Sequence, residues 1–319
     1  MSNTKPILKI LLPLLLGILL VWYSLSQISI STLVQYFKNA NYLWIFLGVF
    51  LGIFSHTSRA YRWLFMAEPL GYKPKLANSF MAVYSAYLIN FTIPRAGEIT
   101  RATILTNYEN IPFEKGIGTI VAERLADTIM LLIIITVALF LEFEFIFNFF
   151  VEKFRPQTLI TGLLILLLMI VLILGFIKRS KSSFAIKIKS FINGLIEGAL
   201  SIFKMKRKWS FIFHTIFIWV MYLLMFYVTT LSLPDLEGIS LAPVLIGFIL
   251  ASFSIAATNG GIGSFPEAIV IAFLIFSLPE DQSRAFGWIM WSSQTIVIII
   301  LGGISLLYLP IYNRRKRAV

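Results

Sequence analysis

The chain has 319 residues, of which 58% are hydrophobic and 13% charged, and its mean hydropathy is +0.87. Soluble domains carry roughly a quarter of charged residues, so these values indicate an integral membrane protein without room for a separate soluble catalytic domain. The net charge of +12 comes from basic residues beside apolar runs, which favours topogenic loops over nucleic-acid binding. Cysteine is absent, which excludes disulfides, thiolate nucleophiles and cysteine metal sites.

Apolar runs long enough to cross a hydrocarbon core, which needs about 20 residues, recur along the chain. The first follows Lys5 and Lys9 and has no small-residue cleavage site after it, so we interpret it as a retained transmembrane helix. We therefore expect an all-α polytopic membrane protein whose residues 1–319 form a single transmembrane domain. Its six full spans are predicted at residues 7–26, 42–63, 116–140, 158–177, 209–231 and 285–309.

Two further apolar regions, 77–106 and 241–277, are interrupted by polar residues at their centres. The first interruption reads Tyr87-Leu-Ile-Asn-Phe-Thr-Ile-Pro-Arg-Ala-Gly-Glu98, and the second reads Ala257-Thr-Asn-Gly-Gly-Ile-Gly-Ser-Phe-Pro-Glu267. Unpaired backbone groups are costly in lipid, so a helix break there must be buried in protein or line a wet cavity. Each region is either two full spans, for up to ten hydrophobic helices, or one re-entrant helical hairpin. The polar turns favour hairpins.

The loop charges predict how these segments are oriented. The loop at 178–208 is strongly basic with Glu197 as its single acid, and Arg314-Arg315-Lys316-Arg317 follows the last span. The positive-inside rule places both in the cytoplasm, so we expect cytoplasmic termini in the plasma membrane of a prokaryote. Region 77–106 then starts and ends inside, and region 241–277 starts and ends outside.

The same order of elements occurs twice: span, amphipathic linker, span, broken region, span. Because residues 1–141 and 158–310 begin on opposite sides, we expect an inverted-topology repeat, which supports alternating access in many carriers. The second linker carries lysines and fits either an interfacial helix on the anionic inner leaflet or a solvated connector. The apolar linker residues at helical spacing are Ile30, Leu33, Val34 and Phe37 in the first half, and Phe184, Ile188, Phe191, Ile192, Leu195 and Ala199 in the second.

Ionisable residues concentrate in the first broken region and in the span that follows it. Such residues are costly in membranes and mark pathways or buried pairs. Glu123 and Asp127 share a helix face, and Arg124 beside them fits a carboxylate or a phosphate. Two interpretations remain open: a polar cavity for a lipid headgroup, and an ion-pair cluster that pins hairpin to helix. The candidate residues of this half are Asn90, Arg95, Glu98, Arg101, Glu123, Arg124 and Asp127.

The second broken region has a glycine-rich turn before a helix start, which binds an anion in some proteins and permits close helix packing in others. Its candidate residues are Asn259, Gly260, Gly261, Gly263 and Glu267. We interpret Arg59 and Arg62, near the end of the second predicted span, as topogenic or snorkelling residues, and His56 and His214 as satisfied histidines. Nucleotide-binding and hydrolase motifs are absent from the sequence, and we expect no catalytic residue, cofactor or metal site.

The motifs also point to a known family. Asn90 with Ile93-Pro-Arg-Ala-Gly-Glu-Ile-Thr-Arg-Ala102, then Ala122-Glu-Arg-Leu-Ala-Asp127, then Gly260-Gly-Ile-Gly-Ser-Phe-Pro-Glu267 occur in that order. Over nearly its whole length the chain resembles the lysylphosphatidylglycerol synthase transmembrane-region family of flippase-like proteins. The resemblance implies roles for the second and third motifs and for Glu98 more directly than for Arg95. In the two-domain synthases of that family the membrane half is implicated in flipping aminoacylated phosphatidylglycerol. Their soluble transferase domain has no counterpart before Val319, so we do not expect aminoacyl transfer.

We therefore predict a flippase or transporter that moves a phospholipid or a polyprenyl-linked lipid between leaflets through a polar cavity formed by the two hairpins. The expected partners are membrane lipids, either an anionic phospholipid or a lipid-linked substrate, with a homo-oligomer or a separate transferase as further options and no nucleic acid. The alternative is a membrane enzyme or enzyme subunit acting on lipid headgroups or lipid-linked sugars, in which intramembrane carboxylates serve acid–base chemistry. A scaffold for a separate transferase is a third option.

Overall fold

The computed structural model describes residues 4–93, 95–144, 147–148, 151, 156–179, 182, 186 and 205–314. These residues form helices and short connections, with no strand among them, which confirms the all-α prediction. The long helices are α1 (Thr4–Ser26), α3 (Tyr42–Ala67), α6 (Phe113–Leu141), α8 (Pro156–Arg179), α10 (Lys208–Thr230) and α13 (Glu280–Arg314).

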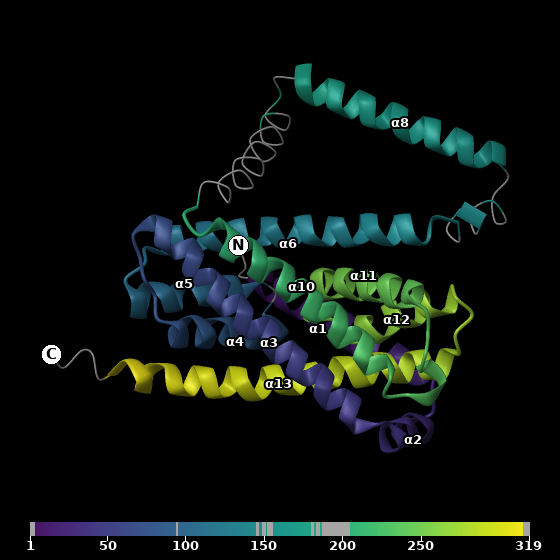
Figure 1. Ribbon diagram of the computed structural model, residues 1–319, viewed down its shortest axis with the longest axis horizontal. Helices are drawn as coiled ribbons and strands as arrows, with labels where there is room; N and C mark the ends of the chain where they lie inside the picture. Colours follow the sequence, from purple (N-terminus) through teal and green to yellow (C-terminus); the bar gives the residue numbers. More distant parts are fainter. Residues whose placement is uncertain are drawn as a thin grey trace.

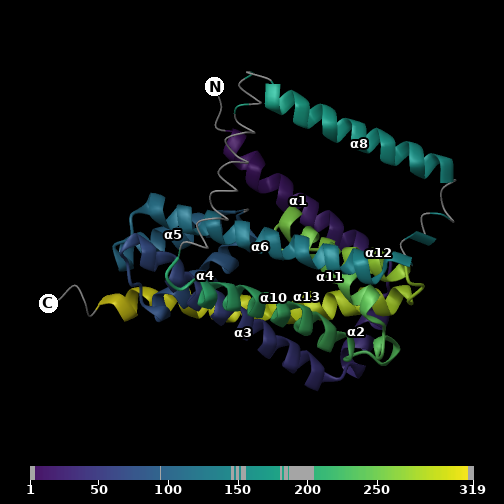
Figure 2. The same cartoon turned by 45° about the horizontal axis from the view of Figure 1, so that its top comes forward.

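Four of the described helices, α3, α6, α10 and α13, are long and apolar enough to cross a membrane. A fifth candidate is bent by 83° between α1 and the short helix α2 (Ile30–Asn39). The described side chains of α8 are all exposed, and Figure 2 shows this helix apart from the others. The chain is thus a multi-pass membrane protein, and the full set of six spans remains a prediction.

The first predicted linker is the amphipathic helix α2, whose Ser29 caps the N-terminus by accepting a hydrogen bond from the Thr32 amide. Leu33 and Phe37 pack against the hydrophobic core, as the spacing predicts. Ile30 and Val34 are instead exposed, so the apolar face is narrower than expected. The second predicted linker, at 184–204, lies outside the described residues apart from Ile186.

Both broken regions are pairs of short helices. The first pair is α4 (Leu76–Thr92) and α5 (Ala96–Glu109), and the second is α11 (Leu241–Ala257) and α12 (Ser264–Leu274). The breaks occur where the backbone turns left-handed, at Arg95 in the first pair and at three glycines in the second. Left-handed geometry is unfavourable for most residues, which explains why the second turn is built from Gly260, Gly261 and Gly263.

Contacts between the arms show that each pair is an antiparallel hairpin. In the first, Asn78 at the start of α4 bonds Glu109 at the end of α5, while Asn90 accepts a hydrogen bond from the Gly97 amide near the tip. A side chain at Gly97 would collide with the Ala86 carbonyl, so the arms touch closely there. In the second, the hydroxyls of Ser254 and Ser264 lie 3.0 Å apart beside the turn.

The two hairpins lie one after the other along α13 (Figure 1). Hairpin α4–α5 packs on the C-terminal part of α13, where Asn313 exchanges amide hydrogen bonds with Asn78. Hairpin α11–α12 packs on the N-terminal part, where Gly287 abuts Pro266. The tips meet at Trp291, whose indole donates to the Gly260 carbonyl (2.8 Å) and whose ring lies 6.5 Å from that of Phe91.

Candidate functional site

A buried group of charges joins α3, α5 and α6. On α6, Glu123 and Asp127 face the same side, as their spacing predicts, and both are buried. Arg59 of α3 holds them together, because its Nη1 donates to Glu123 Oε1 (2.5 Å) and to Asp127 Oδ2 (2.6 Å). The bridge is shielded from solvent, since Arg59 is only 3% exposed.

Arg62 lies one turn further along α3 and is completely buried. Its Nη2 donates to Asp127 Oδ1 (3.1 Å) and its Nη1 to the Thr215 hydroxyl of α10 (2.9 Å). The interpretation of Arg59 and Arg62 as snorkelling residues is therefore wrong. Both arginines lie within α3, which continues to Ala67, and their side chains are buried against neighbouring helices.

Arg101 of α5 connects the first hairpin to the same carboxylates. Its Nη1 lies 2.8 Å from Glu123 Oε2, and its guanidinium stacks over the Trp63 ring, 5.0 Å from the centroid. Arg101 is 3% exposed, yet its Nε and Nη2 have no hydrogen-bond partner within the described part of the chain. Glu123 therefore forms ion pairs with three arginines, because Arg62 Nη2 also lies 3.3 Å from Glu123 Oε1.

The buried group carries a surplus of positive charge. Three arginines, Arg59, Arg62 and Arg101, face two carboxylates, Glu123 and Asp127, which leaves a net charge of +1. A buried charge without a counter-charge is unfavourable, because the protein interior solvates it poorly. The arrangement can therefore attract an anion.

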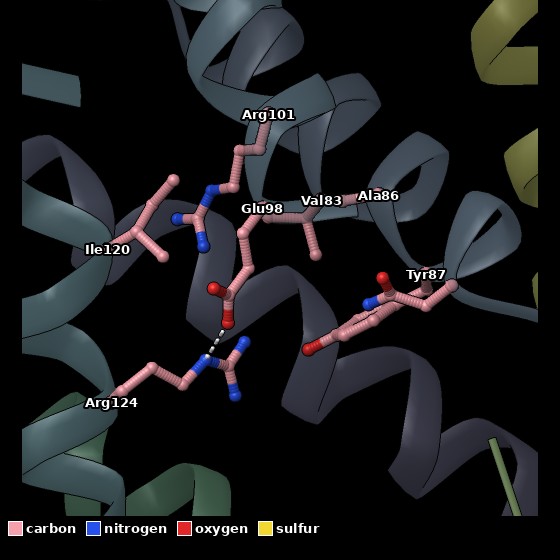
Figure 3. Close-up of a pocket in the computed structure, with 8 residues that line it drawn as sticks. Val83, Ala86, Tyr87, Glu98, Arg101, Ile120 and Arg124 are labelled. Atoms are coloured by element: carbon pink, nitrogen blue, oxygen red, sulfur yellow. Dashed lines mark ion pairs between the residues drawn. The ribbon is translucent and has the colours of Figure 1, made fainter. Parts of the chain in front are cut away.

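A small pocket lies beside this group, between the first hairpin and α6 (Figure 3). Its charged wall includes Arg124, whose Nε lies 3.2 Å from Glu98 Oε1, and this pair is partly open, with 45% and 40% of the two side chains exposed. The cavity of about 10 Å³ holds roughly one water molecule, so this conformation is closed to a headgroup. The lining residues are Val83, Ala86, Tyr87, Asn90, Glu98, Arg101, Ile120 and Arg124.

Two of the predicted residues sit at the tip of this hairpin. Asn90 lines the pocket and closes the turn through its side-chain bond to Gly97. Arg95 precedes α5 in a left-handed conformation (φ 61°) and is exposed, away from the buried charges. Of the charged candidates in the first half, the structure therefore brings together Glu98, Arg101, Glu123, Arg124 and Asp127, and leaves Arg95 outside.

The second set of predicted residues forms a separate group. Glu267 pairs with Arg284 of α13 (3.1 Å), and Arg284 also pairs with Glu280 (3.0 Å). With two carboxylates on one arginine, this group has a net charge of −1. The structure therefore does not bring Glu267 into the buried charges of the first half.

The glycine turn of the second hairpin is tightly packed. The Gly260 amide bonds the Thr258 carbonyl and the Gly261 amide bonds the Thr258 hydroxyl, so neither is directed at a ligand. A side chain at Gly263 would collide with the backbone of α1 at Leu20 and Val21. Asn259, which belongs to this turn, is buried, and its Nδ2 has no hydrogen-bond partner in the described residues.

Sequence reasoning missed three buried arginines. Arg59 and Arg62 stand three positions apart on an apolar helix, which places them on one face. The carboxylates Glu123 and Asp127, four positions apart, also share a face of their helix. That matching spacing is compatible with the pairing, but it does not show which two helices face each other. For Arg284 the signal is weaker: it is a lone arginine just before the predicted span at 285–309, with Glu280 four positions before it.

The two histidines are satisfied by neighbouring hydroxyls, as predicted. His56 Nδ1 lies 3.3 Å from the Tyr222 hydroxyl, and His214 Nδ1 lies 2.8 Å from the Ser58 hydroxyl. Among the described residues, histidines and carboxylates form no group that could hold a metal ion.

Comparison with known proteins agrees with the resemblance carried by the motifs. The model of the family described as "lysylphosphatidylglycerol synthase TM region" matches residues 10–303. A UPF0104 membrane protein from Methanocaldococcus jannaschii is 24% identical over 329 aligned residues, which cover 92% of this chain and 93% of the relative. No solved structure matches the chain. The family match therefore spans the residues of both hairpins and of the buried group of charges.

Proposed function

Because the chain belongs to the lysylphosphatidylglycerol synthase transmembrane-region family, we propose that it is a lipid transporter that moves a phospholipid or polyprenyl-linked lipid between leaflets. The observation that carries this proposal is the surplus positive charge buried among apolar helices beside the pocket of the first hairpin. Intramembrane charges of this kind usually mark a substrate pathway. An anionic headgroup supplies the missing counter-charge.

The proposed topology has six full spans and two re-entrant hairpins that enter from opposite faces of the prokaryotic plasma membrane. The arms support this, because α4, α5, α11 and α12 have 17, 14, 17 and 11 residues, fewer than the approximately 20 that a full span needs. The tip-to-tip contact at Trp291 also supports it, since two hairpins entering from one face would lie side by side. With opposed hairpins, residues 1–141 and 158–310 form the proposed inverted repeat, and the basic segments at 178–208 and 314–317 place the termini in the cytoplasm in this proposal.

In this mechanism the headgroup crosses through the polar site while the acyl chains stay in lipid. The closed pocket must widen to admit a headgroup, so the first hairpin has to move relative to α6. Glu98–Arg124 is the contact that separates most readily, because partly exposed ion pairs contribute only about 0–1 kcal/mol. The buried pairs around Glu123 are far harder to break and hold the rest of the site in place.

The test is leaflet exchange in proteoliposomes that contain fluorescent lipids with anionic, zwitterionic and neutral headgroups. The wild-type protein is expected to speed exchange of at least one phosphate-bearing lipid. Arg124→Gln is expected to slow this exchange at least about tenfold, since a hydrogen bond to a charged group contributes about 1.5–3 kcal/mol. The matched control is Arg207→Gln, which also removes an exposed arginine paired with a carboxylate, Glu68, away from the pocket. Absence of exchange for every lipid, together with a chemical product from one of them, would support the enzyme alternative instead.

A further inference from the structure

The unused nitrogens of Arg101 point to a more specific ligand. Buried polar groups nearly always have partners, so two orphan donors on one guanidinium that lines a pocket indicate a missing acceptor. The other guanidinium on the pocket wall, Arg124, is occupied by Glu98. In Figure 3 the Glu98 carboxylate is drawn between the guanidinium groups of Arg101 and Arg124, which is where an acceptor for both would lie.

We propose that Arg101 and Arg124 form a phosphate subsite and that the Glu98 carboxylate is its internal competitor. This inference rests on the proposed transport site and names the chemistry that the site recognises. Guanidinium groups bind phosphate oxygens through paired, charge-assisted hydrogen bonds, and two of them from different helices can hold one phosphate. A phosphate group carries about one to two negative charges near neutral pH, which is enough to balance the net charge of +1 on the buried group.

The competition gives Glu98 a second role. While the site is empty, its carboxylate neutralises Arg124 and keeps the first hairpin against α6. When phosphate takes Arg124, Glu98 is released, and the contact between hairpin and helix is lost at the same moment. Ligand binding and hairpin opening are thereby coupled, because both depend on the same guanidinium.

The experiment measures phosphate binding to the purified full-length protein in detergent, by calorimetric titration. The probes are inorganic phosphate, a short-chain phosphatidic acid and a short-chain diacylglycerol without phosphate. Glu98→Gln is expected to tighten binding of the phosphate probes about three- to tenfold, since it removes both the competing ion pair and a like charge. Tightening for phosphatidic acid alone identifies a lipid headgroup as the source, and equal tightening for inorganic phosphate identifies a free anion; both outcomes support the subsite.

Two further variants make the test decisive. Arg124→Gln is expected to weaken phosphate binding, and because this side chain is 45% exposed the protein should still fold. Glu68→Gln is the matched control, since it also removes a partly exposed carboxylate paired with an arginine, and it should leave binding unchanged. The proposal is overturned if Glu98→Gln weakens binding, leaves it unchanged, or tightens it no more than Glu68→Gln does.

The proposed function and this inference fail in different ways. Phosphate binding that tightens in Glu98→Gln, with no leaflet exchange of any lipid, refutes transport and keeps the subsite. Leaflet exchange with no tightening in Glu98→Gln keeps transport and refutes the competitor role.

Discussion

The two helical hairpins share one construction and differ in what holds them. Each has a Glu in the first turn of its second arm, Glu98 in α5 and Glu267 in α12, and each Glu pairs with an arginine on the next long helix. The first hairpin is then fixed to α3 and α6 by a network of buried charges. The second is fixed to α10 and α13 by aromatic side chains, with Phe226, Phe273 and Phe286 packed edge to face or stacked.

The comparison shows which features the two hairpins share as structure and which give the first hairpin its own chemistry. A helix break followed by a Glu–Arg pair occurs in both halves, so it belongs to the common construction. Buried donors without a partner occur in both halves, at Arg101 in the first and at Asn259 and Arg284 in the second. The surplus of buried arginines and the pocket described above belong to the first half, whereas the group at Glu267 has an excess of carboxylate. The headgroup chemistry proposed above therefore concerns the first hairpin, whereas the second contributes packing at the shared tip.

The largest expected effect is on the buried charges. Glu123→Gln leaves three buried arginines facing one remaining carboxylate, Asp127, and should lower the free energy of unfolding by about 3–5 kcal/mol. Denaturation in detergent micelles measures this change. Glu68→Gln, which breaks an exposed pair, should shift it by less than about 1 kcal/mol. Equal losses of unfolding free energy in the two variants would contradict the conclusion that buried charges anchor the first hairpin.

The corresponding change in the second hairpin acts on packing. Gly263→Ala forces a non-glycine residue into a left-handed backbone (φ 69°) and drives its Cβ into α1, so we expect a loss of about 3 kcal/mol in unfolding free energy. Gly71→Ala is the control, since its φ is also positive (86°) but nothing lies within 4 Å of the added atom. The control should lose only about 1 kcal/mol from backbone strain. A similar loss in both would mean that α1 does not press on the second turn.

The two helix breaks could be predicted from the sequence because their causes are local. Polar and glycine-rich interruptions of apolar runs specify a break wherever they occur, so the two pairs of short helices were expected at the observed positions. Glu123 and Asp127 share a face by helix periodicity alone, which the spacing also gives. The structure confirms both features.

The anchors could not be predicted because they depend on contacts between distant segments. Arg59 lies 64 positions before Glu123, and nothing near it in the chain distinguishes a buried partner from a snorkelling residue. The separation of Glu267 from the first group has the same origin. Similar local motifs suggested one shared site, whereas each hairpin packs against its own part of α13.

The two Glu–Arg pairs should respond differently to neutralisation. Glu267→Gln weakens a pair in which Arg284 is 2% exposed, and we expect a loss of about 2 kcal/mol in unfolding free energy, limited by the remaining bond to Glu280. Glu98→Gln affects a pair that is about half exposed and should change stability by less than 1 kcal/mol. Parallel denaturation of the two variants measures the contrast. A larger loss for Glu98→Gln would show that the first pair is a structural lock and not a contact that opens.

The smallest expected effect is the coupling between the hairpin tips. Phe91 and Trp291 belong to the first hairpin and α13, and the Trp291 indole also holds Gly260 of the second, so the three meet at one point. A double-mutant cycle of Phe91→Ala and Trp291→Ala should give an interaction energy of about 0.5–1.5 kcal/mol, typical of an aromatic pair. The same cycle for Phe50→Ala and Trp291→Ala is the control, because Phe50 is an exposed aromatic residue on α3. Additive losses in the Phe91 cycle would mean that the tip of the first hairpin is not coupled to Trp291, the residue of α13 that holds the tip of the second.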